Sequence, residues 1–228
     1  DPLYAVLSFR ETKGNRWDPE EFFARGRDEI RAGLEFVFGL GLEPRRGRAL
    51  DFGCGAGRLT QALAGEFEEA VGVDISSTMI EAANRFNTHG ERCRYLVNTD
   101  DHLPMLDDDS FDFVYSNITL QHVPPAASTR YIAEFVRVLK PGGVALFQLP
   151  DGPCHEPGSL GERWYSFRRG PLKRFWKKIR GKPPVEIHYV SRRRVVEIVE
   201  AAGGRVVDVR TDETARRKRR SLFYTVTV

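Results

Sequence analysis

A turn built from three glycines constrains the fold of this chain more than any other feature. An apolar run ends at Asp51, glycines follow at Gly53, Gly55 and Gly57, and a helix-like pattern begins at Arg58. Glycine tolerates positive φ and has no Cβ, so the backbone can turn sharply and lie close to a ligand. The first N–H groups of the helix and the positive end of its dipole then face that ligand. The pattern predicts a strand that turns into a helix at the site of a nucleotide-like cofactor.

Segments typical of strands and of helices alternate through the chain after Pro44. Such alternation implies an α/β fold with a parallel sheet covered by helices on both faces. A further helix is expected before the first strand, with Asp18 as its N-cap and Pro19 at its first position. We expect strands at 48–52, 69–74, 92–97, 111–116, 144–149, 205–211 and 221–228, and helices at about 19–40, 58–66, 77–87, 125–139 and 192–202.

The spacing of the glycines distinguishes between two classes of cofactor. In the dinucleotide fingerprint the third glycine comes three residues after the second, but here that position is Arg58 and the third glycine is Gly57. The carboxylate of Asp51 can meet a cationic group, whereas it would repel a pyrophosphate. The spacing D-x-G-x-G-x-G resembles motif I of the class I S-adenosylmethionine-dependent methyltransferases, whose cofactor carries an amino group, a sulfonium and no phosphate. The alternative is a tight turn without a ligand.

The resemblance covers about residues 46–150, where the chain is similar to the small-molecule methyltransferases of the type 11 group. It implies a Rossmann-like sheet of seven strands in the order 3-2-1-4-5-7-6, with strand seven antiparallel. It also implies S-adenosylmethionine as cofactor, with S-adenosylhomocysteine as product. On this interpretation 1–228 is one domain, in which 1–45 is an N-terminal helical lid, 46–150 the cofactor-binding core, 151–185 a basic and aromatic cap insert, and 186–228 a C-terminal helix with two strands.

The resemblance also assigns cofactor contacts by position. Asp74 ends the second strand, where a carboxylate can bind the hydroxyls of a ribose, and Ile75 would pack on the adenine. The family has an acid four residues before a Leu-Pro pair, for the adenine amino group. This chain has Thr99 there, so Thr99, Asp100, Asp101 and the backbone all stay open, with Asp100 favoured. The whole predicted cofactor set is Asp51, Gly53, Cys54, Gly55, Gly57, Asp74, Ile75, Thr99, Asp100, Asp101, Ser116, Asn117 and Gln121.

The segment after the fourth strand is expected to lie beside the glycine turn. In the family the backbone at this place, here Ser116 and Asn117, contacts the methionine part of the cofactor, and Gln121 lies one turn further on. His122 is the predicted general base, because histidine is the usual proton acceptor near neutral pH. The alternative, which stays open, is a histidine that only forms hydrogen bonds with the backbone of its loop. No metal ion is expected.

Charge is distributed unevenly along the chain. Residues 1–150 carry 16 Lys and Arg against 23 Asp and Glu, whereas residues 151–228 carry 19 against 9. The insert alternates aromatic and basic residues, and a second basic stretch occupies 212–220. Topology places both at the cofactor end of the sheet, which favours an anionic acceptor or a membrane surface that carries it. Core packing and a solvated surface are the alternatives for the predicted substrate residues, which are Trp17, Phe22, Phe23, Trp164, Arg168 and Arg169.

The sequence therefore predicts a cytoplasmic enzyme that methylates an O or N atom of a small, anionic or membrane-associated molecule. A nucleic-acid methyltransferase is less favoured, because the residues after strand four read S-N-I-T and no N-P-P-Y-type tetrapeptide is present. A nicotinamide-dependent oxidoreductase and a non-catalytic cofactor-binding module also stay open. Three scattered cysteines indicate reduced thiols, and no apolar run reaches the roughly 18 residues of a membrane span.

Overall fold

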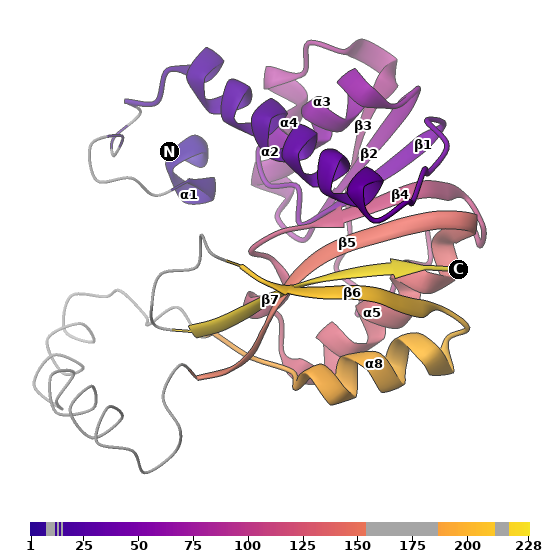
Figure 1. Ribbon diagram of the computed structural model, residues 1–228. Helices are drawn as coiled ribbons and strands as arrows, with labels where there is room; N and C mark the ends of the chain where they lie inside the picture. Colours follow the sequence, from indigo (N-terminus) through magenta and orange to yellow (C-terminus); the bar gives the residue numbers. More distant parts are fainter. Residues whose placement is uncertain (8–11, 13, 15, 154–186, 213–218) are drawn as a thin grey trace, which may run out of the picture.

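A seven-stranded sheet with helices on both faces forms the core of the protein (Figure 1). The computed structural model describes residues 1–7, 12, 14, 16–153, 187–212 and 219–228. The strand order is β3-β2-β1-β4-β5-β7-β6, as predicted. The strands from β1 to β5 pair in parallel, and β7 runs antiparallel to both β5 and β6. The strands are β1 (Arg48–Phe52), β2 (Glu69–Asp74), β3 (Cys93–Val97), β4 (Phe111–Ser116), β5 (Leu139–Pro153), β6 (Arg205–Thr211) and β7 (Arg219–Thr227).

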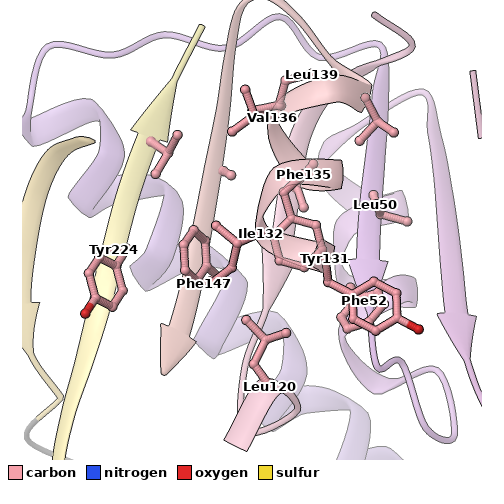
Figure 2. Packing of buried hydrophobic residues seen from close by; sticks show 14 of the residues in the cluster. Leu50, Phe52, Leu120, Tyr131, Ile132, Phe135, Val136, Leu139, Phe147 and Tyr224 are labelled. Atoms are coloured by element: carbon pink, nitrogen blue, oxygen red, sulfur yellow. The ribbon is translucent and has the colours of Figure 1, made fainter. Parts of the chain in front are cut away.

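Two layers of helices cover the sheet. One cluster of buried side chains joins the strands to α2 (Pro19–Gly39), α3 (Arg58–Glu66) and α4 (Ser77–Phe86). The other joins them to α5 (Pro125–Val138) and α8 (Arg192–Ala201). In this second layer Phe147 packs between Phe135 and Tyr224, with ring centroids 5.7 and 5.3 Å away (Figure 2). The sheet is thus buried on both faces, and the carboxyl ends of its parallel strands are the place left for a ligand.

Local signals placed most helices correctly. Asp18 accepts a hydrogen bond from the Glu21 N–H at 3.1 Å, which confirms the predicted N-cap. Ser191 caps α8 in the same way, by accepting from the Arg194 N–H at 3.4 Å. The pattern did not reveal the short helix α1 (Pro2–Val6) or two 3-10 turns, η2 (Gly90–Arg92) and η3 (Leu120–His122). Short elements of this kind carry too few residues for a periodic signal.

The fifth strand is much longer than the predicted 144–149. At one end Leu139 pairs with Phe111 on β4, and at the other the pairing with β7 continues to Pro153. This extension comes from partners far away in sequence, so the local pattern could not show it. Among the described residues, no helix combines the length and the apolar character that crossing a bilayer requires.

Candidate cofactor site

A cavity of about 570 Å³ lies at the carboxyl ends of β1, β2 and β4. The structure brings six of the predicted site residues to its lining, namely Gly53, Gly55, Asp74, Ile75, Asn117 and His122. Residues that the sequence did not single out also line it, among them Val6, Asn98, Ile118, Thr119 and Tyr131. A volume of this size is typical of pockets for small molecules and cofactors.

The glycine turn is tightly enclosed. Gly53 has φ +81°, and a Cβ added there would lie 2.1 Å from the Thr119 Oγ1. Gly55 has φ +52°, and a Cβ there would lie 2.7 Å from the Val6 side chain. The loop after β4 and the helix α1 therefore close on the turn from two sides. Glycine is needed at both positions because of the conformation and because of the space.

Asp74 connects the end of β2 to the turn. Its Oδ2 accepts a hydrogen bond from the Gly55 N–H at 2.9 Å, and its Oδ1 accepts one from the Ser76 N–H at 2.9 Å. Ser76 is the N-cap of α4. The carboxylate therefore organises the loop, and a carboxylate can accept about four hydrogen bonds. Two sites remain for donors such as the hydroxyls of a ribose.

Two amide oxygens of the cavity lining are buried and have no donor among the described residues: Asn98 Oδ1 and Asn117 Oδ1. The Nδ2 of Asn98 donates to the carbonyls of Asp100 and His102 at 3.1 and 3.0 Å, which fixes the side chain. The Nδ2 of Asn117 donates to Glu29 at 2.7 Å. A buried acceptor without a donor is costly unless a ligand supplies one. S-adenosylmethionine carries two amino groups, on its adenine and on its methionine part, so the residues present fit this cofactor.

A carboxylate of α2 holds the wall of the cavity at the end of β4. Besides Asn117, Glu29 accepts a hydrogen bond from the Tyr115 hydroxyl at 3.1 Å and pairs with Arg58 at 2.7 Å. Burial and the nearby negative charge of Glu29 raise the pKa of Tyr115 well above its usual value. The hydroxyl therefore stays a donor. Sequence reasoning missed Glu29, since nothing in the periodicity of α2 separates it from the other charged residues of the helix.

Asp51 lies beneath the turn and does not line the cavity. Its Oδ2 accepts a hydrogen bond from the Thr60 hydroxyl at 2.7 Å. Burial raises the pKa of this carboxyl to about 7, against the opposing effects of the Thr60 hydrogen bond and the Arg58 charge. In this structure Asp51 therefore supports the turn from inside, and its direct contact with the cofactor remains a prediction.

Several other predicted cofactor residues lie outside the cavity lining. Cys54 is buried, and burial raises the pKa of its thiol well above the usual value. Ser116 is buried and donates to the Phe52 carbonyl at 2.9 Å. Gly57 precedes α3 as its N-cap, and a Cβ there would lie 2.5 Å from the Tyr95 hydroxyl. Gln121 is buried, with its Nε2 3.2 Å from the His122 Nε2.

The three residues left open as adenine contacts lie outside the cavity lining. Thr99, Asp100 and Asp101 are exposed and do not line it. The Asp101 carboxylate pairs with Arg130, and the Asp100 carbonyl accepts from Tyr131 and Asn98. The residue of this segment that lines the cavity is Asn98, directly before Thr99. Its signal in the sequence was its place directly after the third strand.

The N-terminal aromatic residues, expected either to contact the substrate or to pack in the core, lie outside the cavity lining. Trp17 and Phe22 are buried against each other, with ring centroids 5.6 Å apart, and do not reach the cavity. Phe23 packs on Phe22 and Phe86. The N-terminal segment reaches the cavity through Val6 instead, and Trp17 holds that segment by donating from Nε1 to the Leu7 carbonyl at 2.9 Å. The predicted substrate residues Trp164, Arg168 and Arg169 lie outside the described residues.

The sequence of the central part matches a known family model. Residues 50–147 match the family described as a methyltransferase domain. The chain is similar to the ubiquinone biosynthesis O-methyltransferase of Hahella chejuensis, with 31% identity over 146 residues, which is 64% of this chain and 60% of that protein. It is also 31% identical over 145 residues to the trans-aconitate 2-methyltransferase of Methylobacterium radiotolerans, over 61% of this chain and 52% of that one. The chain thus spans 60% or less of the length of these two relatives.

The fold matches solved structures over nearly the whole chain. A magnesium protoporphyrin IX methyltransferase from Synechocystis PCC 6803 with bound SAH superposes with a TM-score of 0.60 at 17% identity, over 96% of this chain and 91% of that one. At this identity the likeness establishes the fold, and the strand order agrees with it. Among the described residues, no three His, Cys, Asp or Glu side chains are grouped so as to hold a metal ion.

The close approach at Gly53 predicts the effect of a single methyl group. We expect Gly53→Ala to weaken S-adenosylhomocysteine binding by at least about tenfold, or about 1.4 kcal/mol, because the Cβ would push against Thr119. The control is Gly142→Ala, where φ is +79° but nothing lies within 4 Å. It should cost only the roughly 1–2 kcal/mol of a left-handed alanine and leave affinity unchanged. Isothermal titration and urea unfolding measure the two effects, and equal affinity losses would contradict this account.

The buried carboxyl of Asp51 predicts a pH-dependent stability. Its pKa is about 7 in the folded state against an ordinary value of 3.8, so the folded state binds the proton more tightly. The stabilisation is then fully present below about pH 4 and is lost as the pH rises through about 7. We expect Asp51→Asn to remove up to about 1.4 kcal/mol per pH unit of this decline. Urea unfolding at pH 5, 6, 7 and 8 tests it; parallel profiles for both proteins would refute it.

Proposed function

We propose that this chain, which carries a class I S-adenosylmethionine-dependent methyltransferase domain, transfers the methyl group to an oxygen or nitrogen of a small anionic acceptor. The family match over residues 50–147 bears out the predicted methyltransferase domain, and the curated methyltransferase relatives support the predicted cofactor class. The observation that carries the proposed reaction is the cavity at the glycine turn, with two buried amide oxygens that have no donor among the described residues. The choice of an oxygen acceptor is supported by the relative named as an O-methyltransferase.

In this proposal the chain's own residues hold and orient the reactants. Gly53 and Gly55 let the backbone approach the cofactor, Asp74 binds the ribose, and Asn98 and Asn117 accept from the two amino groups. The chemistry supplied by the bound cofactor is a methyl group already activated on a sulfonium. The protein then needs mainly to align the acceptor and to remove its proton.

His122 is the proposed proton acceptor. It lines the cavity from η3, its ring is exposed, and its backbone N–H donates to the Thr119 carbonyl at 2.9 Å. This bond connects the histidine to the same loop that closes on Gly53. The side chain of Gln121 lies 3.2 Å from the ring and can orient it. A base at this position acts on an acceptor that enters beside the loop after β4.

An anionic acceptor is supported by the basic composition of the chain after residue 150. Residues 151–228 carry 19 Lys and Arg against 9 Asp and Glu. The described residues that flank the insert lie at this end of the sheet: β5 ends at Pro153, and the His188 N–H donates to the Gln121 carbonyl at 2.8 Å. The described residues before and after the insert therefore lie at the carboxyl end of the sheet. A membrane-borne acceptor would meet the same charges.

The first test is cofactor choice. We expect S-adenosylhomocysteine at 100 times its Kd to stabilise the protein by about 2.7 kcal/mol, and to raise the melting temperature accordingly in a thermal scan. NAD at the same concentration is the control and should produce no shift, because the glycine spacing departs from the dinucleotide fingerprint. A shift with NAD and none with S-adenosylhomocysteine would overturn the proposal in favour of a nicotinamide-dependent oxidoreductase.

The second test concerns the acceptor. We expect the double reversal R168E/R169E to raise the acceptor KM about tenfold with little change in cofactor affinity, because on this proposal the positive charges of the insert attract the acceptor. The assay follows transfer of a labelled methyl group to trans-aconitate and to 3,4-dihydroxybenzoate. The matched control is R45E/R205E, which changes the same charge at the amino ends of β1 and β6. Unchanged KM in the first variant, or steep salt-sensitive RNA binding, would argue against a small anionic acceptor.

A further inference from the structure

Ile118, just beyond the end of β4, has a backbone conformation that branched residues avoid. Its φ is +59°, and Asp109 is the only other non-glycine residue with positive φ in the described part of the chain. For a β-branched side chain the left-handed region is a steric outlier. Ile118 lines the cavity between Asn117 and Thr119, which line it too. Strain of this kind persists only where the surroundings enforce it, and it is concentrated at functional sites.

A buried glutamine of β5 supplies the enforcing contact. The Ile118 N–H donates to the Gln148 Oε1 at 3.1 Å. Gln148 is only 2% exposed and lies next to Phe147, which pairs with Ser116 at the end of β4. The acceptor is therefore held in place by the sheet. For Ile118 to relax to negative φ, the 117–118 peptide plane that carries its N–H and the residues after it must rotate relative to each other. A rotation of that plane would leave the buried Gln148 acceptor without a donor, which is unfavourable.

The direction of this hydrogen bond is set by a buried polar chain that ends at the β6–β7 connection. Gln148 Nε2 lies 2.5 Å from the Ser221 Oγ, and the Ser221 Oγ lies 3.1 Å from the Asp212 Oδ2. A carboxylate only accepts hydrogen bonds and a hydroxyl has one proton to donate. Ser221 therefore donates to Asp212 and accepts from the Gln148 amide. This leaves Oε1 of Gln148 turned toward Ile118.

We propose that Gln148 is a positioning residue for the cofactor site. By accepting from Ile118 it holds the residue in the left-handed conformation, and this fixes Asn117 and Thr119 at the cavity. Asn117 then presents its unpartnered buried oxygen, and Thr119 stays packed on Gly53. The inference rests on the proposed function, because the cavity is taken as the S-adenosylmethionine site.

The test uses glycine as a substitute for the enforcing bond, because glycine adopts positive φ freely and alanine does not. We expect Gln148→Leu to weaken S-adenosylhomocysteine binding about tenfold in isothermal titration. The double variant Q148L/I118G should bind within about threefold of I118G. The matched control Q148L/I118A, which also loses the isoleucine side chain, should stay about tenfold weaker than I118A. Rescue by glycine and not by alanine separates positioning through the backbone from a general loss of packing.

Two results would overturn the proposal: wild-type affinity in Gln148→Leu, or equal affinities in Q148L/I118G and Q148L/I118A. If Gln148→Leu alone does not fold, the same comparison is made by whether glycine at 118 restores folding and alanine does not. If the wild-type protein does not bind S-adenosylhomocysteine, the proposed function fails separately. The coupling between Gln148 and the backbone conformation of residue 118 is then measured by urea unfolding. Gln148→Leu should destabilise the I118G variant less than the I118A variant. Equal destabilisation refutes it.

Discussion

Close backbone packing at the glycine turn is the constraint on which the site depends. The turn leaves no space for a Cβ: Gly53 meets Thr119, Gly55 meets Val6, and Gly57 meets Tyr95. These three neighbours come from the loop after β4, from α1 and from β3. Since a side chain of each element packs directly against the backbone of the turn, the turn fixes where three distant segments of the chain lie. The cavity is the space that these contacts leave open.

Buried polar groups then give the cavity walls one arrangement. Glu29 joins α2 to Arg58 at the start of α3 and to Tyr115 and Asn117 at the end of β4. Gln148 connects the same loop to β7. Groups of this kind are unfavourable when unsatisfied, so they specify a unique packing as well as stabilising it. A loop that carries a strained residue can therefore be as well fixed as the strands on which it rests.

Part of the cavity lining could be predicted from the sequence, and the predicted residues that lie elsewhere do so for physical reasons. Gly53, Gly55, Asp74, Asn117 and His122 were found because they end strands or follow them, and the carboxyl ends of parallel strands converge. Asn98 lines the cavity and Thr99 does not, because a family pattern fixes the loop but not which side chain turns inward. The sequence left both substrate contact and core packing open for Trp17 and Phe22, because the choice between them depends on tertiary contacts. In the structure Val6 lines the cavity, and Trp17 and Phe22 are buried in the core.

The sequence by itself determined the strand order, the glycine turn and the class of cofactor. These depend on local signals: periodicity, caps, and the conformational freedom of glycine. Only the tertiary structure decided the length of β5, the left-handed Ile118, and the roles of Glu29 and Gln148. Each of these is a contact between residues far apart in sequence, with no period or spacing to reveal it. The glycine turn depends on both the sequence and the tertiary structure, because its pattern is local while the side chains that pack against it are distant in sequence.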